Sequence, residues 1–341
     1  MSVPGLSDAK ASLCPWMTYP AWGAMGAVLL ATLLLPAATV AAIAPYPFLL
    51  SLVFLGLPHG AWDHRVVAAV TGTRLSPGHL AGVCAAYLLP VALYAGLWVA
   101  APAPAFALFI ALSLIHWGQG DVAYLRMAEC TGSGRPAWLT GLVRGAAPIL
   151  LPVLRFPDDF ARTASGVVGL FSEANPAHWV PSPLACGVGL LLLGAFVAIY
   201  LRFTWREYSR GDRAAARSDA AEIALLYTVF AVANPVLAVG MYFCLWHGAR
   251  HIGRLLLLDD ASRALCAVNR VPIALLRFGW QTLPILAASL GLLALVYGWA
   301  TRTAPGDPQT ALSVYLALIA ALTFPHFLLV CWMDTRESPV R

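Results

Sequence analysis

Long apolar runs, each about as long as a bilayer crossing, follow one another along almost the whole chain. A transmembrane helix needs about 20 predominantly apolar residues, and prolines at 44–47, 101–105 and 234–235 separate neighbouring runs, because proline disfavours continued helix. The predicted spans lie near 22–44, 47–70, 80–101, 104–125, 138–154, 182–203, 219–233, 236–258, 272–300 and 309–333. The pattern therefore predicts an all-α fold, a polytopic transmembrane helical bundle of about ten spans.

The connecting segments alternate between basic and uncharged or weakly charged. Those after the second, fourth, sixth and eighth predicted spans carry arginines, for example Arg74 and Arg126. Because cytoplasmic loops are enriched in Lys and Arg, we expect both termini in the cytoplasm of a cell with a bacterial-type inner membrane. Segment 155–181 is expected to be a long external loop. Residues 1–341 are expected to form a single membrane domain, with an N-terminal tail and extra span at 1–45 and the main bundle at 47–334.

Composition agrees with this interpretation and excludes several classes. The chain is 60% hydrophobic and only 11% charged, whereas a soluble protein carries about 25% charged residues. The net charge of +5 comes mostly from connecting arginines and is interpreted as an orientation signal, so no nucleic-acid partner is expected. The seven cysteines form no C-x-x-C pair, which argues against a zinc site or a disulfide framework. Phosphate-loop, dinucleotide and H-E-x-x-H motifs are absent from the sequence.

Histidines gather at one depth of the predicted bundle. His59, His116, His247 and His251 lie 11 to 15 residues after the start of their respective spans. At roughly 1.5 Å per helical residue, they fall within about one turn of the same plane. A single intramembrane histidine can simply bond to a neighbouring helix, but ionisable residues inside spans are rare and usually mark a site. The matched depths therefore favour one shared site.

His247 and His251 are the sharpest local signal. They are i, i+4 neighbours, about 5–6 Å apart at Cβ, so both rings can reach one metal ion. Arg250 and Arg254 are expected to extend toward the cytoplasmic surface from the end of the same span.

Two carboxylates and two further histidines are expected to support this site without binding the metal. Asp63 follows His59 by four residues and Asp121 follows His116 by five, and a carboxylate that accepts the second ring N–H orients a ligating imidazole. Asp63 could instead pair with Arg65 or His64. His64 lies nearer the cytoplasm and His326 is 17 residues into its span, so both are placed around the ligand set.

The surroundings indicate a lipid-soluble substrate. Aromatic residues lie within two turns of the histidines, namely Trp62, Trp117, Tyr124, Tyr242, Phe243, Trp246, Phe324 and Phe327, and are expected to line its site. Imidazole suits iron, copper, zinc and nickel alike, so ligand type alone does not choose the metal. The histidine count and spacing favour one mononuclear site over a di-iron or bis-histidine haem site. No serine or cysteine is placed as a nucleophile beside these histidines, which disfavours a hydrolase.

Four motifs in order, "GLPHGAWDH", "HWGQGD", "YFCLWHGARH" and "PHFLLVCWMD", resemble the Brp/Blh family of membrane β-carotene 15,15′-dioxygenases over roughly residues 50–335. The resemblance implies cleavage of the central double bond of β-carotene with O2 to two all-trans-retinal, often for a microbial rhodopsin. It also implies non-haem Fe(2+) held by the histidines of "PHG", "HWG" and "WHGARH", that is His59, His116, His247 and His251. The span at 22–44 precedes the region of resemblance.

A non-catalytic function is the alternative hypothesis. A carotenoid, retinoid or metal carrier, or a rhodopsin accessory protein, also needs polar groups at mid-membrane. Against a carrier, the sequence shows no repeat halves and no hydrophilic path of Asp, Glu or Asn along the helices. A haem electron carrier is a third possibility, and a haem absorption band in the purified protein would identify it.

Overall fold

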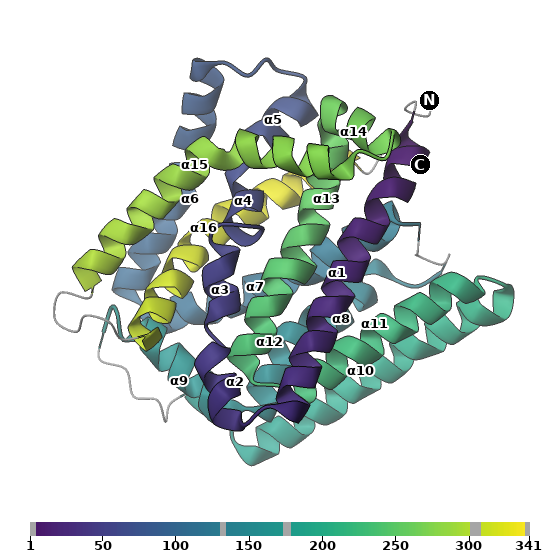
Figure 1. Ribbon diagram of the computed structural model, residues 1–341. Helices are drawn as coiled ribbons and strands as arrows, with labels where there is room; N and C mark the ends of the chain where they lie inside the picture. The colour runs from purple at the N-terminus through teal and green to yellow at the C-terminus, as the bar shows by residue number, and fades with distance from the viewer. Residues whose placement is uncertain (1–4, 130–133, 173–178, 301–307, 338–341) are drawn as a thin grey trace.

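The computed structural model describes residues 5–129, 134–172, 179–300 and 308–337, and this part of the chain is helical without a strand (Figure 1). In chain order the elements are α1 (Leu6–Leu34), α2 (Ala37–Ile43), α3 (Tyr46–Ser51), α4 (Gly56–Ala61), α5 (Asp63–Thr71), α6 (Pro77–Ala100), α7 (Pro102–Met127), α8 (Ala137–Arg155), α9 (Pro157–Val168), α10 (Pro183–Arg210), α11 (Arg213–Val232), α12 (Pro235–Met241), the π-helical segment η2 (Tyr242–Gly248), α13 (Ala249–Leu258), α14 (Asp260–Ala267), α15 (Val271–Ala300) and α16 (Pro308–Glu337). The all-α prediction is confirmed.

Eight helical segments among the described residues are long and apolar enough to cross a membrane. They are Leu6–Leu34, Ala37–Thr71, Pro77–Ala100, Pro102–Met127, Ala137–Arg155, Pro183–Arg210, Val271–Gly298 and Thr310–Arg336. The predicted spans 219–233 and 236–258 are also helical, as α11 and the continuous run from α12 to α13, but ionisable residues lower their hydropathy. The ten-span count and the cytoplasmic termini stay predictions.

The first break in the chain lies earlier than predicted. Helix α1 covers Leu6–Leu34, and Pro36 precedes α2 with an extended backbone, φ −57° and ψ 142°. Pro45, which was expected to end the first span, instead keeps a helical backbone at φ −72° and ψ −23°. The predicted bounds 22–44 are therefore wrong at both ends, because averaged apolarity does not distinguish a proline that starts a helix from one that interrupts it.

Segment 155–181 was expected to be a loop but contains α9. Pro157 stands in the first turn of this helix, and Ala161, Ala164 and Val167 are buried in it. Small residues at i, i+3 and i+6 give α9 a narrow face that packs on the bundle. The loop prediction failed because it overlooked this spacing.

Large apolar side chains cover the outside of several helices. Leu88, Leu89 and Leu93 of α6 are each about two-thirds exposed, and Leu184 and Leu191 of α10 are more than three-quarters exposed. A surface of this kind would be an aggregation liability in water, whereas it suits contact with lipid. The chain is therefore built like a multi-pass membrane protein.

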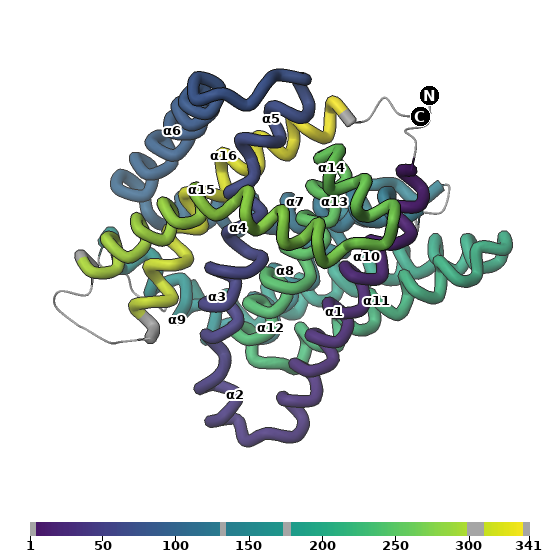
Figure 2. The backbone as a smooth tube through the Cα atoms, turned by 45° about the horizontal axis from the view of Figure 1, so that its top comes forward, coloured from purple at the N-terminus to yellow at the C-terminus, as the bar shows by residue number. Residues whose placement is uncertain are grey.

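Figures 1 and 2 show how the helices are arranged around the centre of the bundle. Helices α7, α8 and the run from α12 to α13 lie inside, α10 and α11 run as an antiparallel pair on one side, and α15 crosses obliquely over α4 and α16. The start of α1 and the end of α16 lie toward the same end of the bundle in both views. These central helices carry buried ionisable residues, among them His116 on α7, Arg144 on α8 and His251 on α13.

Glycines bring α7 and α8 into direct backbone contact. A Cβ atom added at Gly118 would lie 2.0 Å from the carbonyl oxygen of Gly141, and one added at Gly145 would lie 2.2 Å from the carbonyl oxygen of Leu114. No larger residue fits at Gly118 or Gly145 without moving a helix. This close approach, of the kind that small residues permit between membrane helices, fixes the height and rotation of α7.

Candidate metal centre

Five imidazole rings meet in the middle of the bundle. They belong to His59 of α4, His116 of α7, His247 of η2, His251 of α13 and His326 of α16. Each residue is between 2% and 5% exposed. Distances between neighbouring ring centroids run from 4.8 Å, for His116 and His247, to 6.3 Å, for His116 and His251. The structure thus brings together the four histidines selected by depth and adds a fifth; this set is called the histidine cluster below.

A π-helical segment presents His247 beside His251. The seven residues Tyr242–Gly248 form η2 within an otherwise α-helical run. The two imidazoles are nearly parallel, 14° apart in plane and 6.2 Å apart at the centroids. A π-helical segment inside an α-helix is rare and occurs frequently at functional sites. Residue spacing gives no sign of it, so the sequence predicted the pair but not its backbone.

A break in the second span positions His59. Helix α4 starts at Gly56, and the Nδ1–H of His59 donates to the carbonyl oxygen of Leu55 over 3.0 Å. In this tautomer Nε2 keeps its lone pair for another partner. A Cβ atom at Gly56 would lie 2.7 Å from the ring of Phe243. Glycine at this position therefore allows α4 to approach η2.

Asp63 serves His326, whereas the sequence predicted that it orients His59. The Nδ1–H of His326 donates to Asp63 Oδ2 over 2.8 Å, and the hydroxyl of Tyr87 donates to the same oxygen over 2.5 Å. The i, i+4 register between His59 and Asp63 is lost because the helix is interrupted at Trp62, which ends α4 and precedes α5.

His326 was expected to lie off the plane of the other histidines. Its ring centroid is instead 5.1 Å from that of His59, 4.9 Å from that of His116 and 5.2 Å from that of His251. Counting residues from the start of a span measures depth only when helices are upright and begin at the same height, which these do not. His64, the other histidine placed around the site, bonds to the carbonyl oxygen of Ala61.

Asp121 was predicted to orient His116 but faces a different group. Arg144 Nη1 and Arg250 Nη1 each donate to it over 3.0 Å, and Trp246 Nε1 donates over 3.1 Å. No bond from His116 to Asp121 occurs in the described residues. A separation of five residues turns Asp121 away from the face of α7 that carries His116.

The contacts of Asp121 belong to a larger buried set of charges, here called the ion cluster. Its members are Asp121, Arg135, Arg144, Asp219, Glu222 and Arg250, all essentially buried. Arg144 bonds to Glu222 and Asp219 at 2.7 Å each. Burying a charge is costly unless it is paired, and here every charge has a partner of opposite sign. The expectation that Arg250 extends to the surface was therefore wrong.

One helical run serves both clusters through two faces. His247 and His251 point to the histidine cluster, while Trp246 and Arg250, also four residues apart, contact the ion cluster. The sequence analysis missed the ion cluster because it considered the charges of each span separately. The sequence did contain a signal for the ion cluster. Opposite charges on separate apolar helices indicate that the two side chains pair with each other inside the bundle.

Three polar residues, Gln119, Arg254 and Asp334, contact one another beyond the histidines on their helices, and they are called the polar group below. Arg254 pairs with Asp334, and Gln119 Nε2 donates to the same carboxylate. Each residue follows a cluster histidine on its own helix, Gln119 after His116, Arg254 after His251 and Asp334 after His326. Arg254 is only 8% exposed, so the prediction that it extends toward the surface was wrong as well.

The histidine cluster leaves several ring nitrogens without a hydrogen-bond partner. These buried atoms are both nitrogens of His116 and Nε2 of His247, His251 and His326. Among the described residues, no group of three or more His, Cys, Asp or Glu side chains is identified as a metal site by its arrangement. Each unsatisfied buried polar atom costs about 1–3 kcal/mol, and a divalent ion that accepts imidazole ligands would satisfy them together. The donor chemistry of the cluster therefore fits a metal ion.

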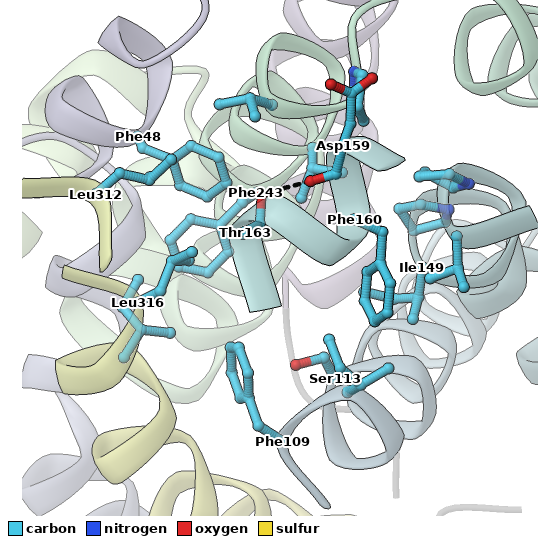
Figure 3. A pocket seen from close by; sticks show the side chains of 18 of the residues that line it. Phe48, Phe109, Ser113, Ile149, Asp159, Phe160, Thr163, Phe243, Leu312 and Leu316 are labelled. Carbon is cyan, nitrogen blue, oxygen red and sulfur yellow. Dashed lines mark hydrogen bonds between the residues drawn. The ribbon is translucent and has the colours of Figure 1, made fainter. Parts of the chain in front are cut away.

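An apolar pocket adjoins the histidine cluster. Figure 3 shows Phe48, Leu312 and Leu316 on one side of it and Ser113, Ile149 and Phe160 on the other. Trp117 and Phe243 also line it, with ring centroids 5.8 Å and 6.3 Å from that of His247. On α16 the pocket residues Leu312, Leu316 and Ile319 precede His326, and on α7 they extend from Phe106 to Trp117, the residue that follows His116. A long apolar molecule in this pocket would therefore contact Trp117 and Phe243, the two rings that pack beside His247.

Three of the eight aromatic residues predicted to line the substrate site lie beside the pocket or the cluster. Trp117 and Phe243 line the pocket, and the ring of Phe327 is 6.3 Å from that of His116. The other five make different contacts: Trp62 with Phe278 and Gln281, Tyr124 with Thr18 and Arg250, Tyr242 with Trp117 and Phe230, Trp246 with Asp121, and Phe324 with Tyr94. Phe48, Phe109 and Phe160 were missed because apolar residues are ordinary in membrane helices.

Comparison with known proteins matches the part of the chain that carries the histidine cluster. The model of the family "Beta-carotene 15,15'-dioxygenase" matches residues 50–334. A Halobacterium salinarum protein named "Probable beta-carotene 15,15'-dioxygenase Blh" is 36% identical over 327 residues, 91% of either chain. A second from the same organism, named "Probable beta-carotene 15,15'-dioxygenase Brp", is 26% identical over 84% of this chain and 82% of its own.

A "Beta-carotene 15,15'-dioxygenase" of an uncultured marine bacterium is 24% identical over 58% of this chain and 65% of its own length. No solved structure matches significantly. The matched region begins within α3 and ends within α16, so it contains all five histidines of the cluster. This chain belongs to the beta-carotene 15,15'-dioxygenase family.

Proposed function

We propose that this protein cleaves the central 15,15′ double bond of β-carotene with O2 and releases two molecules of all-trans-retinal. One observation carries the proposal: a buried cluster of imidazoles with unpartnered nitrogens lies against an apolar, aromatic-lined pocket. The names of the relatives supply the substrate and the reaction. A lipid-soluble polyene and its lipid-soluble product both suit a site inside a helical membrane bundle.

The proposed cofactor is Fe(2+), held by His59, His116, His247 and His251. A non-haem iron ion supplies the capacity to react with O2 that amino-acid side chains lack. The protein contributes position and environment. Leu55 fixes the tautomer of His59, η2 sets the two rings of His247 and His251 side by side, and the apolar pocket excludes water from the polyene.

Location and partners belong to the same proposal. We expect the protein in the inner membrane, with the polyene entering from the lipid and a microbial rhodopsin accepting the retinal. The exposed leucines of α6 and α10 support contact with lipid.

The test is expression in bacteria that produce β-carotene, with extracted pigments analysed by chromatography and His247→Ala as the control. Retinal that appears only with the unaltered protein is the expected result. Unchanged β-carotene, with the protein verified in the membrane and iron supplied, would refute the proposal and favour a carotenoid carrier or a rhodopsin accessory protein. An aldehyde of another length would refute central cleavage alone.

A further inference from the structure

We infer that His326 is a fifth imidazole of the metal centre and that Tyr87 and Asp63 position it. The inference rests on the proposed function, because it concerns the same iron site. It goes beyond the four-histidine set, which leaves His326, Asp63 and Tyr87 without a defined task at the metal.

His326 lies among the other rings. Its centroid is within 5.2 Å of the centroids of His59, His116 and His251. Those separations are as short as the separations among the other four rings, of which His247 and His251 are 6.2 Å apart. A metal ion that contacts the other rings would therefore lie within reach of His326.

The hydrogen bonds of His326 leave one nitrogen for a ligand. Its Nδ1–H donates to Asp63 Oδ2, so its Nε2 carries a lone pair in the neutral ring. Nε2 is buried and has no hydrogen-bond partner. A ligating histidine usually donates its second N–H to a carboxylate, which fixes the tautomer and the direction of the ring. Within the described residues, His326 is the only member of the histidine cluster that bonds to a carboxylate.

The charge of Asp63 points the same way. The carboxylates of the ion cluster each pair with at least one arginine, for example Asp121 with Arg144 and Arg250. Asp63 is 4% exposed, and its only ion-pair contact among the described residues is with His326. Tyr87 adds a neutral donor to the same oxygen. A buried carboxylate without an arginine is costly, and a cation bound on the other side of the imidazole would offset its charge.

A purely structural role predicts a different outcome. If His326 only anchored α16 to Asp63, its removal would reduce stability but leave the affinity for metal unchanged. Iron binding measured on folded protein therefore separates the two roles, and free imidazole supplies a second readout, because it can replace a missing ligand but cannot restore a missing helix contact.

The experiment measures Fe(2+) binding by anaerobic titration of purified full-length protein, together with the visible spectrum of the Co(2+)-loaded form. The variants are His326→Gly, Asp63→Asn and Tyr87→Phe, each checked for folding by gel filtration. His79→Ala is the control, because His79 lies at the start of α6 and bonds to Thr73 and the carbonyl oxygen of His64.

His326→Gly is expected to bind Fe(2+) at least about 10-fold more weakly, with a changed Co(2+) spectrum, and added imidazole is expected to restore part of the affinity. Asp63→Asn should weaken binding by about 10–100-fold, the usual effect of losing such a support. Tyr87→Phe should have a smaller effect in the same direction, and His79→Ala none.

This inference would be overturned, and the proposed function left intact, if wild-type protein and His326→Gly bound iron equally well and gave the same Co(2+) spectrum. Wild-type protein that binds no iron would overturn both. If His326→Gly fails to fold, Asp63→Asn decides between the roles: unchanged affinity overturns the positioning, and weakened affinity with a changed spectrum supports it.

Discussion

Each histidine of the cluster owes its position to the neighbours of its own helix. His59 is tied to Leu55, His326 to Asp63, and His247 stacks on Phe243 and lies close to Trp117. His116 has no bonded partner for either ring nitrogen. Its position depends on the packing of α7. Because both of its ring nitrogens lack a partner, a bound metal ion would stabilise the ring of His116 more than those of the other four histidines.

His116→Ala is therefore expected to lower bound iron to less than about a tenth of the wild-type content and to abolish carotenoid cleavage. The substitution removes the one imidazole that α7 contributes. Iron per purified protein is measured by elemental analysis, with His79→Ala prepared in parallel. Full iron content in folded His116→Ala protein would contradict the proposed ligand set.

Arg144 carries the largest share of the ion cluster, with bonds to Asp121, Asp219 and Glu222. Arg144→Met leaves these buried carboxylates with fewer cations, which typically costs about 3–5 kcal/mol. We expect a clear loss of thermal stability in detergent, followed by fluorescence-detected gel filtration after heating. Arg202→Met, at an exposed position of α10, should change stability by less than about 0.5 kcal/mol; equal effects of the two substitutions would refute a structural role for the ion cluster.

At the scale of helices, irregular backbone sets the direction of the functional side chains. The interruption at Trp62 separates His59 from Asp63, and η2 carries His247 beside His251 while Trp246 and Arg250 face away. Regular α-helices in the same places would give other neighbours. The positions of α7 and α8 depend on glycine in the same specific way.

Gly118→Ala is expected to move α7 relative to α8, because the added Cβ would lie 2.0 Å from a carbonyl oxygen. Since His116 precedes Gly118 by two residues, both stability and iron affinity should fall. The matched control is Gly96→Ala in α6, where nothing lies within 4 Å of the added atom and where alanine should favour helix by up to about 1 kcal/mol. Wild-type iron affinity in Gly118→Ala protein would show that α7 can shift without displacing His116.

For the whole molecule, the pocket, the histidine cluster and the polar group follow one another along the bundle. On α16 they appear in sequence order as Leu312 and Leu316, then His326, then Asp334. The histidine cluster thus has apolar residues before it on α16 and the polar contacts of Arg254, Asp334 and Gln119 after it.

Leu316→Trp is expected to narrow the pocket and lower retinal formation by about tenfold or more, since small displacements of a reacting bond cost large factors in rate. Iron content should stay at the wild-type value. The same substitution at Leu328, which is 43% exposed on the same helix, should leave both unchanged. Normal cleavage by Leu316→Trp protein would exclude this pocket as the polyene site.

The path of α11 through the membrane is also open to a direct test. Ten spans place the turn at Ala233 and Asn234 outside the cell, whereas it lies in the cytoplasm if only the eight most apolar segments cross. We expect a fusion of alkaline phosphatase after residue 233 to be active, because the charges of Asp219 and Glu222 are neutralised by Arg144 and Arg250. The ten-span prediction would be contradicted if the phosphatase fusion were inactive and a separate fusion of green fluorescent protein at the same residue were fluorescent.

The sequence by itself determined the fold class of the protein and selected four of the five histidines whose rings meet in the bundle. A helix satisfies all its backbone hydrogen bonds within one continuous segment where no water is available, so the long apolar runs predicted the all-α bundle. Histidines are rare enough in such runs that their matched depths selected His59, His116, His247 and His251. The structure adds His326 to these four, and their role as ligands stays a prediction.

Only the tertiary structure decided which group faces which. The addition of His326, the partners of Asp63 and Asp121, and the burial of Arg250 depend on helix tilt, on the break at Trp62 and on η2. Hydropathy is an average along one helix, whereas the bond of Arg250 to Asp121 joins side chains 129 residues apart and that of His326 to Asp63 joins side chains 263 residues apart. The packing of the helices, such as the contact of Gly118 with Gly141, decides which of these side chains meet. Residue spacing along the chain carries no information on this packing.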